Sequence, residues 1–303
     1  MPGQILTQIP SHFTTQFTDN WEFQLQQKDS RFENLVRHYT VKGKERRISY
    51  LGALSMRPVV TRNGRTIPQD SPMAARWLRV RGYDAVTWID EWDEISLGEL
   101  PAPESEHVTG HALAAKREKD NIIIAAFSDD AYVGDQGTDA VAVPATQKVA
   151  VNYVRTGSPA NSGLTLAKLI RAQYIMDTAE VPDEDRYLAI SAAQLADLLA
   201  DVDQVSNSRY SDVRALVDGK VSKFMGFTFV KSQKLTQDVA TDIRICPAWH
   251  KMGVAFGDAQ QPKARIDILP TQNHTIQIRT TLVAGATRLE EERVVLIYCD
   301  QSP

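Results

Sequence analysis

One stretch constrains the fold of this 303-residue chain more than any other, the run from Pro101 to Phe127. Its apolar residues recur at three- and four-residue spacing, which predicts one long amphipathic helix over residues 103–127. They are Val108, Ala112, Ala115, Ile122, Ile123 and Ala126, with Lys119 interrupting the face. At 1.5 Å per residue the helix is about 35–40 Å long, and its narrow, alanine-rich stripe fits against a sheet. We therefore expect a spine helix on which the rest of the chain folds.

The bulk composition excludes several classes of protein. A formal net charge of −4 argues against a dedicated nucleic-acid binder, which carries a strong basic excess. No apolar run approaches 18 residues, and the N-terminus lacks the basic and apolar blocks of a signal peptide. Cys246 and Cys299 stand in apolar surroundings and are too few for a disulfide scaffold, which predicts two buried thiols made in a reducing cytoplasm.

Charge is distributed in two adjacent blocks of opposite sign before and at the start of the spine helix. Residues 42–81 carry ten Lys or Arg and two acids, a local balance of +8, whereas residues 83–106 carry eight acids and no Lys or Arg. One interpretation is that the blocks neutralise each other within one molecule. The other is that the basic block meets the acidic block of a neighbouring copy.

The basic block has the pattern of a long hairpin. Residues 76–81 and 86–89 alternate with period two and read as strand, and residues 46–54 can pair with them. The turn-forming residues between them mark a tip, and they are Pro58, Asn63, Gly64, Pro68 and Pro72. Because a lone two-stranded hairpin is marginal in water, this arm is expected to lie against another surface.

The second half of the chain divides at a Gly- and Ser-rich linker, residues 157–163. Beyond it, helices and short apolar strands mix, which predicts a compact α/β layer domain. The expected helices are 164–178, 192–199 and 208–217, and the expected strands 186–190, 227–230 and 243–246. Past Gly257 only strands are expected, at 265–269, 275–283 and 293–299. A tight turn followed by a charge cluster is expected over 285–292, between the last two strands.

A search for catalytic or metal-binding constellations finds none. His107 and His111 stand four apart on the spine helix, a spacing that can hold zinc, but a third ligand is not evident and two exposed helix histidines are favoured. The acidic loop 128–139 lacks the spacing of a calcium loop. There is no phosphate-binding loop and no Gly-x-Ser-x-Gly elbow, neither cysteine has an activating neighbour, and His250 is expected to be structural.

Four motifs in order and spacing resemble the major capsid proteins of tailed bacteriophages, in the branch called "phage capsid protein". They are 123–127 (IIAAF), 180–187 (EVPDEDRY), 216–227 (LVDGK followed by FMGF) and 285–295 (GATRLEEERVV). Each motif alone is weak. The likeness extends from about Thr40 to Cys299 and is poor in the first 20 residues.

This resemblance implies an α+β chain with the Hong Kong 97-type coat fold. Its parts would be an N-terminal arm (1–40), an extended E-loop hairpin (41–95), a peripheral domain (96–160 and 258–303) with the spine helix and a β-sheet, and an inserted α/β axial domain (161–257). Relatives assemble as hexamers and pentamers into an icosahedral shell around double-stranded DNA and carry no catalytic site. The implied location is the virion, after synthesis in the bacterial host cytoplasm.

Two departures from some relatives bear on partners. With only about 40 residues before the hairpin there is no room for a cleaved scaffolding segment, so a separate scaffolding protein is expected. Residues 46–80 contain no lysine, so no covalent crosslink is expected at the hairpin tip. The resemblance further implies a portal protein at one vertex, allows a decoration protein, and implies non-specific contact with packaged DNA; no cofactor, metal or membrane is expected.

The charge blocks and the resemblance together give a hypothesis for the subunit interface. The basic residues are Arg57, Arg62, Arg65, Arg76 and Arg79, and their expected partners on an adjacent subunit are Asp90, Glu91, Asp93 and Glu94. Two alternatives stay open. One is an encapsulin-like nanocompartment shell that encloses a cargo enzyme, and the other is a soluble α/β enzyme whose site cannot be read from the sequence.

Overall fold

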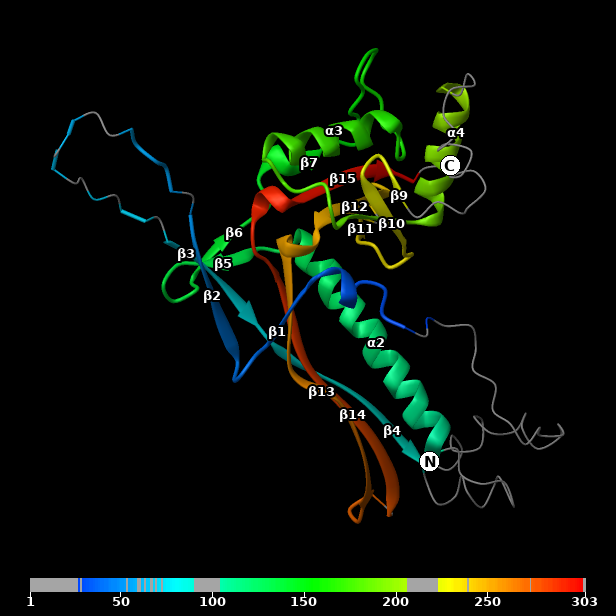
Figure 1. Ribbon diagram of the computed structural model, residues 1–303. Helices are drawn as coiled ribbons and strands as arrows, with labels where there is room; N and C mark the ends of the chain where they lie inside the picture. The colour runs from blue at the N-terminus through cyan, green and yellow to red at the C-terminus, as the bar shows by residue number, and fades with distance from the viewer. Residues whose placement is uncertain are drawn as a thin grey trace.

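The computed structural model of the chain describes residues 27, 29–52, 54–58, 61–62, 64–65, 68, 70–71, 73–89, 104–205, 223–238, 240–272 and 274–301. Three sheets, a long helix and two shorter helices make up this part of the molecule (Figure 1). The expected helix 208–217 lies outside the described residues.

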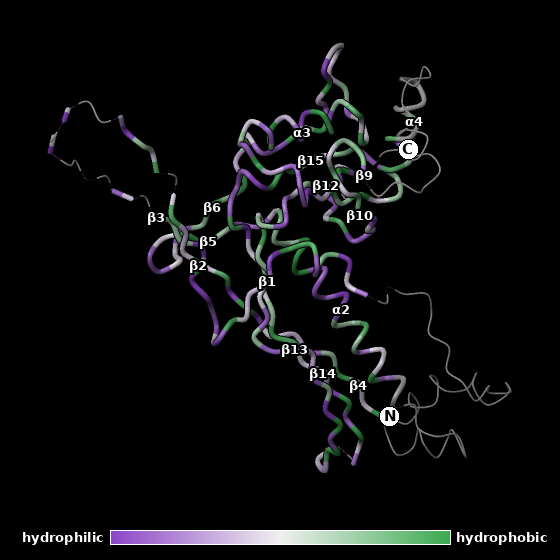
Figure 2. Tube along the Cα trace, viewed as in Figure 1, coloured by the Kyte–Doolittle hydropathy of each residue, from purple (hydrophilic) through white to green (hydrophobic). Residues whose placement is uncertain are grey.

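The spine helix is present as α2, Glu104–Ser128, which confirms the prediction from periodicity. Figure 2 shows that its C-terminal part is hydrophobic while the rest is mixed, and Ile122, Ile123 and Phe127 are buried in the main core. Lys119 is also buried, at 5% exposure, because its Nζ donates to Glu33 Oε1 at 2.5 Å. The charged residue that interrupts the apolar face is thus an ion-pair partner inside the protein.

The first sheet is a long ribbon that lies along α2 (Figure 1). Its strands, in spatial order, are β1 (Arg37–Thr40), β13 (Val254–Leu269), β14 (Thr275–Arg288) and β4 (Arg81–Ile89). β1 is parallel to β13, and the other pairs are antiparallel. Two expectations are corrected here. Residues 86–89 pair with β14 and not with 46–54, and β13 begins at Val254, well before the expected 265.

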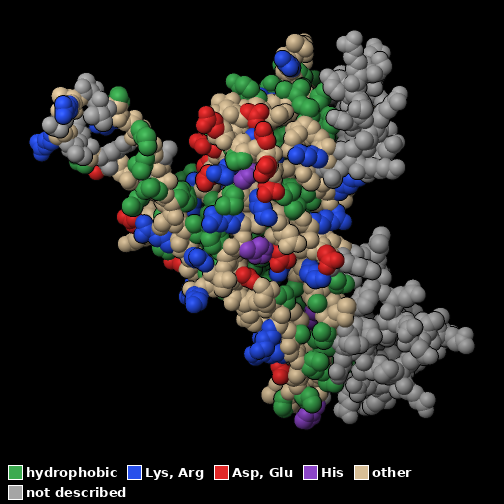
Figure 3. All heavy atoms as spheres, in the orientation of Figure 1, with side chains coloured by type: hydrophobic (Ala, Val, Ile, Leu, Met, Phe, Trp, Pro, Cys, Tyr) green, Lys and Arg blue, Asp and Glu red, His purple; other side chains and the backbone are tan. Residues whose placement is uncertain are grey.

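The second sheet carries a hairpin that extends far from the body of the molecule (Figures 1 and 3). Its strands are β2 (Glu45–Leu51), β3 (Met73–Arg79), β5 (Ala131–Val133) and β6 (Asp139–Val141), in that order and all antiparallel. We call residues 45–79 the hairpin arm. The pairing of 46–51 with 73–78 confirms that this part of the basic block forms a hairpin.

The third sheet has seven strands and includes the α/β segment expected after the linker. In spatial order they are β7 (Lys148–Val149), β15 (Val294–Asp300), β12 (Ile243–His250), β8 (Arg186–Ile190), β10 (Phe227–Lys231) and β9 (Lys223–Phe224), with β11 (Gln237–Asp238) paired to β12. The accompanying helices are α3 (Leu166–Thr178) and α4 (Ala192–Val205). β15 was expected among the peripheral strands, but it pairs with β7 and β12. The domain boundaries themselves stay a prediction.

Short 3-10 turns connect several of these elements, namely η1 (Glu33–Leu35), η2 (Ala145–Gln147), η3 (Lys251–Gly253) and η4 (Glu291–Arg293). The tight turn expected at the start of residues 285–292 is not present there. Residues 285–288 continue strand β14, and only 291–293 form a turn. Gly285 allows this because it has no Cβ. A Cβ there would stand 1.9 Å from the backbone oxygen of Arg79, where β14 crosses the end of β3. The glycine marks a close approach within a strand.

The main core joins the seven-stranded sheet to the C-terminal half of α2. Trp249 lies at its centre, fully buried, with ring centroids 4.7 Å from Phe127, 5.8 Å from Phe32 and 5.7 Å from Tyr187. Its indole N–H donates to Leu35 O at 3.0 Å. A large aromatic ring that also satisfies its polar atom fixes how the segment before β1 crosses the sheet.

A buried lysine ties the linker region to β15. Lys168 of α3 is 0% exposed, and its Nζ donates to the carbonyl oxygens of Ser162, Gly163 and Tyr298 at 2.6, 2.8 and 3.1 Å. Burial lowers the pKa of this amine, and the three carbonyls satisfy its three donors. The predicted buried thiols of Cys246 and Cys299 lie nearby, and contact with Cys299 together with burial raises the pKa of Cys246.

Candidate assembly interface

The hairpin arm carries the arginines expected at a subunit interface, and its tip holds three of them. Arg57, Arg62 and Arg65 are exposed, and no hydrogen bond or ion pair joins them to any other described residue. Figure 3 shows basic side chains on this projecting end, and in residues 46–80 every basic residue is an arginine. Exposed apolar side chains accompany them along the arm: Leu51 (55%), Leu54 (56%), Met56 (101%) and Met73 (83%).

The other two arginines have partners within the subunit. Arg79 Nε lies 3.3 Å from Glu45 Oε2, its Nη2 donates to Gly137 O at 2.7 Å, and its guanidinium stands 4.1 Å from the ring centroid of Tyr132. Arg76 is 9% exposed and lies 2.9 Å from Glu291 Oε1. For these two, charge is neutralised by residues outside the acidic block. Their contact with a neighbouring subunit stays a prediction.

The expected acidic partners Asp90, Glu91, Asp93 and Glu94 lie outside the described residues. They follow β4 in the sequence, and among the described strands β4 is the last on its side of the ribbon. On this strand Val86 and Trp88 are 43% and 58% exposed, and Asp84 pairs with Arg279 at 3.0 Å.

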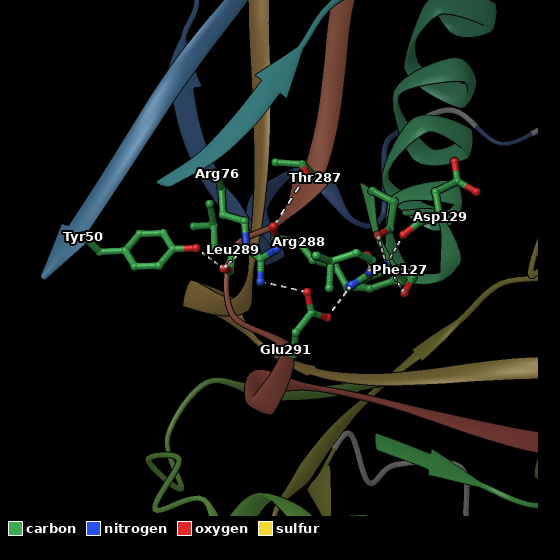
Figure 4. A network of polar contacts seen from close by, with 10 residues as sticks. Tyr50, Arg76, Phe127, Asp129, Thr287, Arg288, Leu289 and Glu291 are labelled. Atoms are coloured by element: carbon green, nitrogen blue, oxygen red, sulfur yellow. Dashed lines mark hydrogen bonds and ion pairs between the residues drawn. The ribbon is translucent and has the colours of Figure 1, made fainter. Parts of the chain in front are cut away.

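At the base of the arm, one carboxylate is shared by two buried arginines (Figure 4). Glu291 Oε1 accepts from Arg76 Nη2 and Glu291 Oε2 accepts from Arg288 Nε, both at 2.9 Å. Leu289 O accepts from Arg76 Nε at 2.9 Å and from the Tyr50 hydroxyl at 2.7 Å. The arm's two strands are therefore fixed to the segment that follows β14.

Arg288 extends this network to the end of the spine helix. It is 1% exposed, and its guanidinium donates to the carbonyl oxygens of Ala126, Phe127, Asp129 and Val141. A cation at a helix C-terminus satisfies carbonyls that have no helical partner and interacts favourably with the dipole. Burial raises the pKa of the nearby Asp129 carboxyl, an effect that the charge of Arg288 opposes.

Sequence reasoning missed Arg288 and Glu291 as organising residues, although both belong to the motif 285–295. The three-residue spacing between them was the available signal. Their common neighbour Arg76 is more than 200 positions away, so the network could not be inferred from local pattern.

A groove of about 680 Å³ lies beside this network. Arm residues, the turn after β5 and the acidic segment 289–292 line it. The residues are Arg47, Tyr50, Met73, Ala74, Ala75, Arg76, Val133, Gly134, Asp135, Leu289, Glu290, Glu291 and Glu292. At its mouth Arg47 pairs with Asp135 at 3.1 Å, and both side chains are largely exposed.

His111 of the spine helix lines a second cavity, of about 440 Å³, between α2 and the ribbon. His111 Nε2 lies 2.8 Å from Thr87 Oγ1 and its Nδ1 lies 3.4 Å from Thr280 Oγ1. Burial, followed by the nearby His107, lowers the pKa of His111. Within the described residues no group of three or more His, Cys, Asp or Glu side chains is placed to hold a metal ion.

A further charged anchor holds the segment before β1 to the spine helix. Asp120 is 1% exposed and accepts from Ser30 Oγ at 2.5 Å and from the backbone N–H groups of Arg31 and Phe32 at 3.1 and 3.3 Å. Two ion pairs flank it, Lys116–Asp29 and Lys119–Glu33. Residues 29–33 are therefore held at a fixed point beside α2.

Other expectations from single residues have simple outcomes. His250 is 6% exposed and accepts from the Met252 N–H at 3.2 Å, as expected for a structural histidine.

Among the helices in the described ranges, none combines the length and apolar character needed to cross a membrane.

The model of the phage capsid protein family matches residues 9–301. A search of curated protein sequences gave no match.

Solved phage capsid structures share the fold. The capsid of cyanophage P-SCSP1u is 17% identical, with a TM-score of 0.68, over 96% of this chain and 94% of that chain. Mycobacterium phage Che8 is 16% identical, with a TM-score of 0.66, over 95% and 97%. The head of Helicobacter pylori bacteriophage KHP40 is 10% identical, with a TM-score of 0.67, over the full length of both chains. The chain therefore belongs to the phage capsid protein family, and it is a major capsid protein of a tailed phage with the Hong Kong 97-type fold.

Proposed function

We propose that copies of this chain assemble through the hairpin arm into hexamers and pentamers of an icosahedral shell around double-stranded DNA. The observation that supports this proposal is the exposed surface of the arm. It projects from the body with exposed apolar side chains and with arginines that have no partner among the described residues (Figures 1 and 3). Such a surface is expected to be covered when the protein functions.

The acidic block of a neighbouring copy supplies the complementary charge. Asp90, Glu91, Asp93 and Glu94 follow the edge strand β4, and Arg57, Arg62 and Arg65 lie at the tip of the arm. An exposed pair contributes only about 0–1 kcal/mol, but a shell repeats each contact many times. In this arrangement charge sets which surfaces meet, while apolar contact by residues such as Met56 adds affinity.

The remaining partners follow from the family and from the net charge. A separate scaffolding protein directs closure, a portal protein occupies one vertex, and a decoration protein is a further candidate. The acidic chain touches packaged DNA without gripping it, since non-specific phosphate binding needs clustered cations. The chain acts in the virion after synthesis in the bacterial host cytoplasm.

The family supports a structural role without catalysis, and the two alternatives are less well supported. An encapsulin-like shell would enclose a cargo enzyme where this proposal has DNA. A soluble α/β enzyme would be a stable monomer whose pocket binds a small molecule. Electron microscopy shows whether closed particles form, which separates the shells from a soluble enzyme. Analysis of whether the particles contain DNA or a cargo enzyme separates the two kinds of shell.

The test is reversal of charge at the tip, with Arg62→Glu and Arg65→Glu in one chain. We expect the subunit to fold with an unchanged urea midpoint, while light scattering and electron microscopy show no closed particles. The matched control, Arg62→Lys with Arg65→Lys, keeps the charge and should assemble. Normal shells from the reversed variant would show that the tip is not an interface.

A further inference from the structure

The turn from β1 into β2 concentrates positive charge at the surface. Arg37, Lys42, Lys44 and Arg46 lie within ten residues of sequence, and all four side chains are exposed. None of them forms an ion pair with another residue in the described part of the chain. We call these four residues the loop patch. Figure 1 shows the turn at the opposite end of the hairpin arm from its tip, so the loop patch is separate from the tip arginines.

The acids next to the loop patch in the sequence and in the sheet do not neutralise it. The carboxylate of Glu45 lies 3.3 Å from Arg79, outside the patch. Asp258 lies on the neighbouring strand β13, and its carboxylate accepts a hydrogen bond from Gln261. Even with Asp258 counted, the positive charges of this surface exceed the negative charges by three. The surface therefore attracts an anionic partner.

Two guanidinium groups of the loop patch are positioned by one aromatic ring. The Cζ atoms of Arg37 and Arg46 lie 4.8 and 4.9 Å from the ring centroid of Tyr39. Arg46 Nη1 also donates to Thr40 O at 2.6 Å. A guanidinium that stacks on a ring keeps its N–H edge free, and in the described structure no hydrogen bond uses the side-chain donors of Arg37. Two like charges held on one ring favour an anion with several acceptor oxygens.

The lack of exposed apolar side chains separates two kinds of anionic partner. A protein partner is normally held by apolar and aromatic side chains at the centre of the interface. The hairpin arm exposes such side chains, for example Met56 and Met73. Within residues 37–46 no large hydrophobic side chain is exposed, since Val41 is 2% exposed and Tyr39 is partly covered. Cations without apolar anchors fit the sugar–phosphate backbone of a nucleic acid, which is bound through charge.

We infer that the loop patch is the site at which this chain contacts the phosphate backbone of double-stranded DNA. This inference rests on the proposed shell function, in which the chain encloses DNA. It refines that proposal, because the contact is confined to one cluster of cations on a chain whose formal net charge is −4. Four cations are too few for tight non-specific binding, so the DNA is held weakly and reversibly, and more weakly as the salt concentration rises.

The first measurement is the salt dependence of DNA binding by the full-length subunit. Fluorescence anisotropy follows a labelled duplex of about 20 base pairs, and the slope of log affinity against log salt is about 0.9 per phosphate contacted. Lys42→Gln with Lys44→Gln should lower this slope by about 2 and weaken binding at about 50 mM salt by at least about tenfold. The matched control is Lys223→Gln with Lys231→Gln, which removes the same charge from exposed positions on β9 and β10 and should leave the slope unchanged.

Assembled particles provide the second measurement. Acetic anhydride should acetylate Lys42 and Lys44 several-fold less in DNA-filled shells than in shells from which the DNA has been released, while Lys223 and Lys231 react equally in both, as mapped by mass spectrometry. A carbodiimide tests for a protein partner, and crosslinks from Lys42 or Lys44 to a carboxylate of another copy would overturn the inference. Equal slopes for the patch variant and its control would overturn it too. If no shells enclose DNA, the proposed function fails, and the salt titration still decides whether the loop patch binds phosphate.

Discussion

The base and the tip of the hairpin arm are built from the same residue types and behave in opposite ways. At the base, Arg76 is buried, shares Glu291 with Arg288, and connects β3 to the end of the spine helix. At the tip, Arg57 and Arg62 have no partner in the described part of the chain. The subunit itself therefore organises the base, whereas the tip depends on other molecules. Mutations at the two ends should affect different properties, stability at the base and assembly at the tip.

The largest effect on stability is expected from removal of the shared carboxylate. Glu291→Ala leaves two buried guanidinium groups without their common partner, and such a loss typically costs about 3–5 kcal/mol. Urea denaturation of the subunit measures it. The matched control is Glu292→Ala next to it, because this side chain is exposed and should change the free energy of unfolding by less than about 0.5 kcal/mol. Similar values for the two variants would show that the shared carboxylate does not organise the base of the arm.

A smaller loss is expected from crowding the point where β14 crosses the arm. The Cβ of Gly285→Ala would stand 1.9 Å from the backbone oxygen of Arg79, so β14 and the end of β3 must move apart. We expect this to lower the free energy of unfolding by about 1–3 kcal/mol. Gly82→Ala is the control, because its Cβ meets no atom within 4 Å. Thermal unfolding should separate the two variants, and an unchanged midpoint for Gly285→Ala would contradict the close crossing.

A third effect, on the body of the subunit and not on the tip of the arm, is expected from acid. The folded-state pKa of His111 is lowered by burial and by His107, so the unfolded chain binds its proton more readily. The stability contributed by neutral His111 is present above pH 6.5, the ordinary histidine pKa, and is lost as pH falls below it. His111→Gln should therefore reduce the fall in melting temperature between pH 7 and 5. An unaltered slope would show that other groups are responsible for the pH dependence of stability.

The smallest effect on the folded subunit is expected at the tip. Arg57→Gln should change the free energy of unfolding by less than about 0.5 kcal/mol, because no described residue pairs with it. Raising the salt concentration from 0.1 to 1 M shortens the screening length from about 10 to 3 Å and should slow assembly of the native chain. Light scattering measures assembly and urea unfolding measures stability in the same buffers. Strong salt dependence of unfolding alone would reverse the comparison.

Sequence pattern predicted the elements whose signal is local. The spine helix, α3, β8 and β15 appear close to the expected positions, because each has apolar residues at the period of its own structure. The four motifs, taken together, also predicted the coat fold that the comparisons confirm.

What the sequence could not give is the set of contacts between distant segments. β4 resembles a hairpin strand in its alternation, and only pairing with β14 places it in the ribbon. Gly285 resembles a turn residue, yet its role is to let two strands cross. Arg76 cannot be told from Arg57 by its neighbours in the chain, since burial beside Glu291 depends on more than 200 intervening residues. For the candidate interface, local charge identified the arm but could not separate its base from its tip.

The position of β15 has a consequence for how the protein is made. This strand lies inside the seven-stranded sheet, between β7 and β12, whose residues are synthesised much earlier. The sheet therefore cannot close, and Glu291 cannot fix the base of the arm, until ribosomes have passed residue 300. Contacts so far apart in the chain form late and slowly. Interrupted translation should thus yield chains with no ordered arm base, which cannot take a place in a growing shell.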